Sequence, residues 1–220
     1  MPPDVPLYLL DYAGVLVFGA TGALAAARRG YDLVTFAFFA VVTGIGGGTL
    51  RDLLIGAPVF WVRDAGYVVA AVAAAVAVWF VGPRPRLFAG LLWLDALGLA
   101  AYAIVGAAKA AQYGVPPVVC VLMGALTATF GGVLRDVLAG EPSVLLRREI
   151  TISAGLVAAA VYVALRWAGL DTTIAAAIAF VGGFGLRAGA LLWGWSLPAF
   201  SKAIADRGGM GSGDAGPLNR

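Results

Sequence analysis

Long apolar runs alternate with short polar connections along the whole chain. A helix needs about 20 apolar residues to cross a bilayer, and charges, Gly and Pro mark the connections between such helices. On this pattern we predict seven membrane-spanning helices, at residues 6–27, 33–59, 65–81, 87–111, 115–139, 150–167 and 172–195. The predicted fold is therefore an all-α, polytopic membrane protein.

The first three predicted spans align with the next three, without a gap, when the chain is shifted by 84 positions. The clearest matching segments are TGIGGGTLRD at 43–52 and TATFGGVLRD at 127–136. We infer an internal duplication. Three spans per unit is an odd number, so the second unit must enter the bilayer from the opposite face, which makes the two units inverted repeats. Inverted repeats that meet at broken helices are a recurring transporter architecture.

The duplication divides the chain into four parts. The two three-helix repeats occupy 1–84 and 85–168, the seventh helix lies within 169–200, and 201–220 is predicted to be a disordered cytoplasmic tail, since it is rich in Gly, Ser and charge. Lys and Arg gather in alternate connections, and the side with more of them is expected to be cytoplasmic. That count predicts an outside N-terminus and a cytoplasmic C-terminus.

Composition supports a membrane protein and excludes several other classes. Apolar residues make up 61% of the chain and charged residues 12%, against about 25% charged in soluble domains. No basic run with interleaved aromatics is present, so we expect no nucleic-acid partner. The chain has no His, and Cys120 is its one cysteine. An internal disulfide is thereby excluded and a zinc or Cys/His catalytic site is disfavoured. We predict a protein that is not an enzyme and has no cofactor, with Cys120 as a small buried hydrophobe.

Glycines interrupt the middle of the second and fifth predicted spans. They are Gly44, Gly46, Gly47 and Gly48 in the second span, and Gly131 and Gly132 in the fifth. Each costs about 1 kcal/mol in a helix interior, so we predict a kink or a short unwound stretch. Carbonyls freed at membrane depth must be buried in protein or line water. If they line water, they become ligands for a small cation, to which the hydroxyls of Thr127 and Thr129 would add oxygens.

Close helix packing is the plainer interpretation of a membrane glycine, because small residues let two backbones approach. We prefer it for the glycines outside the motif, namely Gly14, Gly22, Gly98, Gly106, Gly185 and Gly189. For the duplicated motif we favour a functional role, since packing alone does not need a charged pair one turn away.

Each motif ends in an Arg-Asp pair, Arg51-Asp52 in the first copy and Arg135-Asp136 in the second. An unpaired arginine near a helix centre costs at least ~2.5–3.5 kcal/mol. The adjacent aspartate lies about 100° round the helix, so we do not expect neighbours to pair. We hypothesise instead the pairs Arg51–Asp11 and Arg135–Asp95, one on each side of the glycines. The alternative is that Asp11 and Asp95 cap helices at the membrane interface.

Arg187 lies within the seventh span and has no counterpart in the repeat. It could pair with an acidic residue at a subunit contact or extend to the cytoplasmic interface. We predict the second.

The seven-span pattern, the two GG-x-L-R-D segments and the ending WGWSLPAF at 193–200 resemble the prokaryotic trimeric intracellular cation (TRIC) channel family. The resemblance covers residues 7 to about 200. It implies a homotrimer in the prokaryotic inner membrane, in contact with membrane lipids, with a separate pore in each protomer. It also implies permeation of monovalent cations, chiefly potassium, with sodium as a second candidate.

The resemblance assigns bent, pore-lining second and fifth helices. Carried over by motif, the bends lie at Gly46, Gly47, Gly48, Gly131 and Gly132, where carbonyls would hold potassium transiently. In the second copy Phe130 would narrow the path. The basic lipid-binding motif of animal members is not evident in this sequence.

Two other functions compete with a passive channel. One is a secondary transporter for glycine or another small zwitterion, which would hold a carboxylate and an ammonium at the same broken helices. The other is a non-transporting scaffold or enzyme, which is disfavoured because no nucleophile–base set or metal cluster is visible. A coupled transporter usually needs a group that titrates or binds an ion. The acids within the spans are few and most have a candidate arginine partner, which favours the channel.

Overall fold

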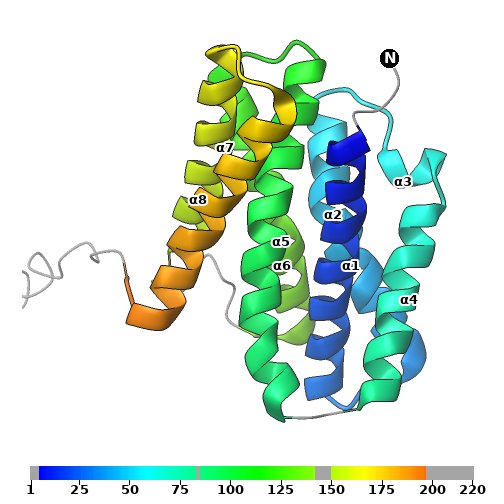
Figure 1. Cartoon of the computed structure of the whole chain (residues 1–220). Coiled ribbons are helices and arrows are strands. Elements are labelled where there is room, and N and C mark those ends of the chain that lie inside the picture. The colour runs from blue at the N-terminus through cyan, green and yellow to red at the C-terminus, as the bar shows by residue number, and fades with distance from the viewer. Residues whose placement is uncertain (1–4, 83–84, 142–149, 197–220) are drawn as a thin grey trace, which may run out of the picture.

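The computed structural model describes residues 5–82, 85–141 and 150–196, and this part of the chain is helical (Figure 1). Its helices are α1 (Val5–Arg28), α2 (Leu33–Leu54), α3 (Phe60–Arg63), α4 (Gly66–Val81), α5 (Pro85–Gln112), α6 (Pro117–Ala139), α7 (Thr151–Trp167) and α8 (Thr172–Trp193). The predicted all-α class is confirmed. The predicted cytoplasmic tail, 201–220, and residues 197–200 of the WGWSLPAF ending lie outside the described residues.

Five described helices are long and apolar enough to cross a membrane: α1, α2, α5, α6 and α8. The helices α4 and α7 are also apolar but shorter, with 16 and 17 residues. They correspond to the third predicted span of each repeat, 65–81 and 150–167, so the shorter span occupies the same position in both repeats.

Local chemistry sets the helix ends. The Asp32 carboxylate accepts a hydrogen bond from the backbone N–H of Thr35 at the start of α2, which satisfies one of the free donors there. At its other end α2 stops at Leu54, so the predicted span 33–59 was too long. Gly56 takes a left-handed φ of +66°, and Pro58 has no N–H with which to continue the helix.

The helices form two groups of three. The helices α1, α2 and α4 pack on one another, and so do α5, α6 and α7. The groups meet where α1 lies on α5 and α2 lies on α6, while α8 covers α7 and α5. Figure 1 shows α1 and α5 running in opposite directions. Equivalent helices of the two predicted repeats therefore lie antiparallel at the centre of the bundle.

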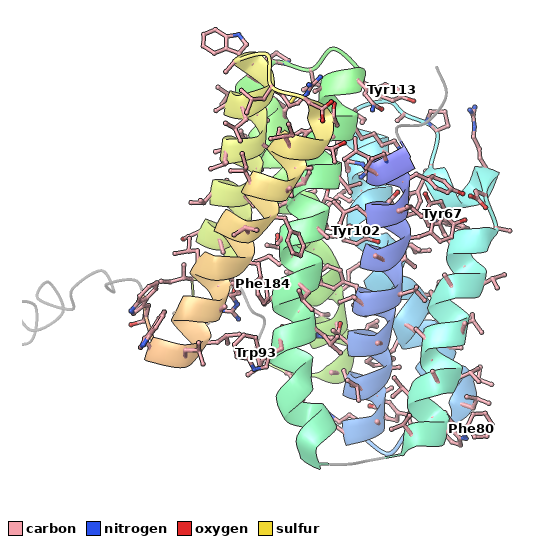
Figure 2. All side chains as sticks on the ribbon, viewed as in Figure 1. Tyr67, Phe80, Trp93, Tyr102, Tyr113 and Phe184 are labelled. Carbon is pink, nitrogen blue, oxygen red and sulfur yellow. The ribbon has the colours of Figure 1, made fainter. Side chains whose placement is uncertain are left out.

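Glycine and aromatic side chains interlock between α1 and α5. The rings of Phe18 and Tyr102 stack with centroids 5.2 Å apart, and Figure 2 shows Tyr102 inside the bundle. A Cβ on Gly14 would lie 2.3 Å from the Tyr102 ring, and one on Gly98 would lie 2.8 Å from the Phe18 ring. Both contacts need glycine, and they are equivalent under the 84-residue shift.

Most of the predicted packing glycines behave in this way. Gly22 faces the carbonyl of Phe39, Gly106 faces the side chain of Thr127, and Gly189 lies under Trp193 and Trp195. Gly185 differs, since no described atom lies within 4 Å of a Cβ built there. Its predicted packing role is wrong within this chain, because its face of α8 is open. Cys120 is buried, as predicted.

Candidate functional site: a helix crossing between two charge clusters

The backbones of α2 and α6 come into close contact at Gly47 and Gly131. A Cβ on Gly47 would lie 2.1 Å from the carbonyl oxygen of Thr127, and one on Gly131 would lie 2.3 Å from that of Thr43. The two contacts are equivalent under the 84-residue shift. At these positions only glycine lets the backbones meet.

Both motifs are continuous α-helix, so the predicted alternative of an unwound stretch is wrong for this structure. The tight contact of the two backbones gives the helical glycines a packing role that offsets their low helix propensity.

The other motif glycines have different neighbours. A Cβ built on Gly44 would lie 3.0 Å from the carbonyl oxygen of Val15, and one on Gly46 would lie 2.6 Å from Leu134 Cδ1. A Cβ on Gly48 would lie 2.7 Å from Phe60 Cε1, and one on Gly132 would lie 3.7 Å from Arg135 Nη2. Gly132 therefore has room for a methyl group, whereas its neighbour Gly131 has none. The sequence offers no reason to distinguish these glycines, because their differences depend on which neighbouring helix or side chain each one faces.

The threonine hydroxyls beside the crossing bond within their own helix. Thr127 Oγ1 donates to the carbonyl of Met123 at 2.6 Å, and Thr129 Oγ1 donates to that of Ala125 at 2.8 Å. Their oxygens keep acceptor capacity only. Phe130 is half-buried on the same helix.

A first charge cluster, which we call the inner cluster, consists of Arg135, Asp95 and Asp136. The guanidinium of Arg135 lies 2.8 Å from Asp95 Oδ1 and 2.9 Å from Asp136 Oδ1, and its side chain is 5% exposed. It also donates to Thr21 Oγ1 at 3.2 Å. The hypothesised Arg135–Asp95 pair is therefore present, and two carboxylates face one guanidinium.

The outer cluster consists of Arg51, Asp52 and Lys109. Arg51 Nε donates to Asp52 Oδ1 at 2.8 Å, and Nη2 lies 2.8 Å from the same oxygen but outside hydrogen-bonding geometry. Lys109 Nζ lies 2.8 Å from Asp52 Oδ2. The side chains of Arg51 and Asp52 are fully buried.

Asp11 stands apart from the outer cluster. Its Oδ2 accepts a hydrogen bond from the Tyr67 hydroxyl at 3.2 Å, and no ion pair joins it to Arg51 among the described residues. The predicted Arg51–Asp11 pair is therefore wrong in this structure. The acidic partner of Arg51 is instead Asp52, which also pairs with Lys109.

Both arginines pair with the adjacent aspartate, contrary to our expectation. Arg51 reaches Asp52 and Arg135 reaches Asp136 through Nε and Nη2. The angular offset of neighbours does not prevent this, because a long arginine side chain can fold back across the helix surface to a short carboxylate. Such pairing strongly stabilises a buried guanidinium, because a buried charge without a partner has a high free-energy cost.

Lys109 is a site residue that the sequence analysis did not predict. A signal was present: the residue lies within the predicted span 87–111, and its counterpart in the first repeat is Ala25. A charged residue within a predicted span, with no charged counterpart in the other repeat, indicates an ion pair that forms in only one of the two clusters.

The short helix α3 covers the outer cluster. The Phe60 ring centroid lies 5.9 Å from the Arg51 guanidinium and 5.6 Å from Lys109 Nζ, within range of cation–π attraction. The backbone N–H of Phe60 donates to Asp52 Oδ2 at 3.0 Å. These contacts join α3 to the charged end of α2.

The connection between α3 and α4 is fixed to α1 by Asp64. Its Oδ2 accepts hydrogen bonds from the hydroxyls of Tyr12 and Tyr8, at 2.8 and 3.0 Å, and its Oδ1 accepts from the N–H of Gly66. The Tyr12 bond, followed by the Gly66 bond, lowers the pKa of the Asp64 carboxyl below its ordinary 3.8, because each stabilises the charged form.

Arg187 is 2% exposed. The predicted extension of its side chain to the membrane interface is therefore wrong, since the residue is buried within the protein.

Three comparisons with known proteins each match most of the chain. A family model described as glycine transporter matches the chain twice, over residues 8–83 and 92–167. The matches begin 84 positions apart, which is the shift that aligns the two motifs. The two matches of one family model agree with the duplication inferred from the sequence.

Solved structures and curated relatives extend the match over most of the chain. The TRIC trimeric intracellular cation channel orthologue from Rhodobacter sphaeroides is 46% identical, with a TM-score of 0.84 over 87% of this chain and 100% of that one. A prokaryotic TRIC channel crystallised in KCl is 28% identical, with a TM-score of 0.80 over 88% and 99%. The UPF0126 inner membrane protein YadS of Escherichia coli strain K12 is 35% identical over 199 residues, 89% of this chain and 96% of YadS. The chain therefore belongs to the prokaryotic TRIC channel family, a multi-pass membrane protein family that the glycine transporter model also describes.

Proposed function

We propose that the chain is a channel for monovalent cations, chiefly potassium with sodium as a second candidate, whose path runs along the α2–α6 crossing. Two of its relatives are described as TRIC channels, one of them as a trimeric intracellular cation channel orthologue. The proposal includes no catalytic role and no resident cofactor.

The charge balance of the two clusters carries the proposal. Arg135 faces two carboxylates, so the inner cluster is net negative when all its groups are ionised. At the other end Arg51 and Lys109 face Asp52, with Asp11 nearby on Tyr67. The outer cluster alone therefore sums to +1, and an ionised Asp11 beside it would bring that end to zero. The net negative inner cluster is what favours a cation.

The crossing itself supports a gated path. The backbones touch at Gly47 and Gly131, so there is no room for an ion between these two residues. We propose that conduction requires α2 and α6 to separate, by bends at Gly46, Gly47, Gly48, Gly131 and Gly132. Separation would expose the carbonyls of Thr43 and Thr127, which face the crossing, and a potassium ion would bind them transiently. Phe130 would narrow the α6 side of the same path.

We further propose seven membrane spans in two inverted repeats, with the boundaries 1–84, 85–168 and 169–200. The antiparallel α1 and α5 support the inversion, as do the reciprocal glycine contacts at both helix crossings. In the proposed topology the N-terminus lies outside and the C-terminus in the cytoplasm.

We propose that three copies assemble, each with its own path. The support is the description of the Rhodobacter sphaeroides relative as a trimeric channel. The exposed apolar side chains of α2, α4, α6 and α8 provide surface for contact with lipid and with other protomers.

Transport of glycine or another small zwitterion is the second candidate. The description of the family model favours it, and each cluster holds both an acid and a base. In that case the guanidinium of one cluster would bind the substrate carboxylate.

Purified protein in potassium-loaded vesicles separates the two candidates. A channel collapses a potassium gradient at a rate that glycine does not affect. Saturable uptake of radiolabelled glycine without potassium flux would support the transporter and contradict the channel.

A further inference from the structure

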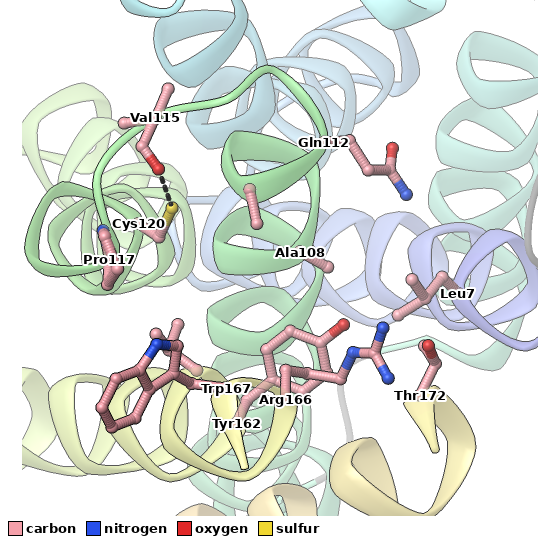
Figure 3. Close-up of a pocket in the computed structure, with 12 residues that line it drawn as sticks. Leu7, Ala108, Gln112, Val115, Pro117, Cys120, Tyr162, Arg166, Trp167 and Thr172 are labelled. Atoms are coloured by element: carbon pink, nitrogen blue, oxygen red, sulfur yellow. Dashed lines mark hydrogen bonds between the residues drawn. The ribbon is translucent and has the colours of Figure 1, made fainter. Parts of the chain in front are cut away.

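A cavity opens at the end of the bundle where α8 begins and α5 and α7 end (Figure 3). Its volume is about 360 Å³. Arg166 is the one charged residue among its described lining, and its polar neighbours there are Gln112, Tyr162 and Thr172. No carboxylate is among the described residues that line the cavity, so its charge suits an anionic group.

The guanidinium of Arg166 points toward Leu7 and Thr172, as Figure 3 shows. It donates one hydrogen bond to the carbonyl of Leu170. A guanidinium has five N–H donors in a fixed fork, so that bond orients the group while other donors remain for a ligand.

An apolar groove adjoins the cavity between α1 and α8. It has a volume of about 320 Å³ and shares Leu7 and Thr172 with the cavity. The rest of its lining is almost entirely apolar and includes Leu10, Ala177 and Phe180. A basic cavity thus continues into an apolar groove that runs along two apolar helices.

We propose that the cavity and the groove together bind one phospholipid, with its phosphate at Arg166 and an acyl chain between α1 and α8. A guanidinium matches phosphate geometry, because two parallel N–H donors can reach two oxygens. Trp167, which lines the cavity and is 86% exposed, is of the residue type that lies at the headgroup level of a bilayer. The cavity is therefore at the depth at which a lipid phosphate lies.

The test uses the full chain purified in detergent, with binding of phosphatidylglycerol followed by native mass spectrometry. Arg166→Gln removes the phosphate ligand, and Ala177→Phe fills the groove at an exposed position without changing charge. Arg63→Gln is the matched control, since Arg63 is an exposed arginine on α3 and does not line the cavity. We expect phosphatidylglycerol to bind about tenfold more weakly to Arg166→Gln, which corresponds to one charge-assisted hydrogen bond. Binding to Ala177→Phe should also weaken, because the ring occupies the groove, and binding to Arg63→Gln should be unchanged.

Three results would overturn the proposal. The first is an equal loss in Arg63→Gln, which would make the effect one of general surface charge. The second is unchanged binding in Ala177→Phe, which would exclude the groove. The third is displacement of the lipid by inorganic phosphate alone at the same concentration, which would make the site an anion site without an acyl chain. Both Arg166 and Ala177 are exposed, so correct folding of the variants is expected and is checked by their elution as a single species.

Discussion

Replacing Asp95 by alanine removes one of the two carboxylates that hold the buried guanidinium of Arg135. The pair is short, at 2.8 Å, and both side chains are almost fully buried. Its counterpart under the 84-residue shift is Asp11, which has no ion pair to Arg51 among the described residues and accepts one hydrogen bond of 3.2 Å from Tyr67. The two aspartates therefore offer a matched comparison in one molecule.

The expected loss of stability is larger for Asp95. Removing one partner of a buried ion pair costs about 3–5 kcal/mol, and the lower end applies because Asp136 stays at 2.9 Å. Removing Asp11 forfeits one hydrogen bond to a charged group, about 1.5 kcal/mol. Asp95→Asn keeps an oxygen acceptor and loses the charge, so its cost lies between these values.

Thermal unfolding of the purified variants in one detergent measures the difference. At about 2–4 °C per kcal/mol for a chain of this size, Asp95→Ala lowers the midpoint by roughly 6–12 °C and Asp11→Ala by roughly 3–6 °C. An equal fall of the midpoint in Asp11→Ala and Asp95→Ala would contradict this difference, because the two repeats would then hold their arginines in the same way.

Three further predictions concern the crossing, α3 and the connection that follows α3. Gly131→Ala places a methyl group 2.3 Å from the Thr43 carbonyl oxygen, so we expect overpacking to lower the free energy of unfolding by about 1–3 kcal/mol. Gly132→Ala is the control, because that position has room for a methyl group. An equal loss of stability in both variants, measured by thermal unfolding, would contradict a close backbone contact at Gly131. Phe60→Ala uncovers the outer cluster, so potassium flux into vesicles should rise above that of the wild type, and an unchanged flux would exclude α3 as a cover of the path. The lowered pKa of Asp64 stabilises the fold fully above its ordinary value of 3.8, and this contribution is lost as the pH falls through the lowered pKa. Asp64→Asn should lack that acid-dependent loss in thermal unfolding measured from pH 5 downward, and a variant that follows the wild-type curve would show that Asp64 is not its source.

The fold followed from the sequence because its signals are periodic and repeated. Apolar runs placed the long helices, and the 84-residue shift predicted that α1 and α5 are equivalent, which the reciprocal Gly14–Tyr102 and Gly98–Phe18 contacts reflect. The end of α2 was misplaced by five residues, because the apolar character of the chain continues through Pro58 although the helix does not.

The site was predicted less completely, because side-chain pairing is decided by packing. Arg135–Asp95 followed from the repeat, whereas Arg51–Asp11 did not form, since Tyr67 and Lys109 exist in only one repeat. The mates of these two residues are Thr151 and Ala25. Positions where the repeat is not symmetric are thus where the symmetric prediction failed.

The reversal potential of single-channel currents tests the central claim most directly. The purified protein is placed in a planar bilayer between unequal potassium chloride solutions. If the net negative inner cluster selects cations, the current reverses close to the potassium equilibrium potential. Reversal close to the chloride potential would contradict the account, because it would mean that the arginines dominate the path.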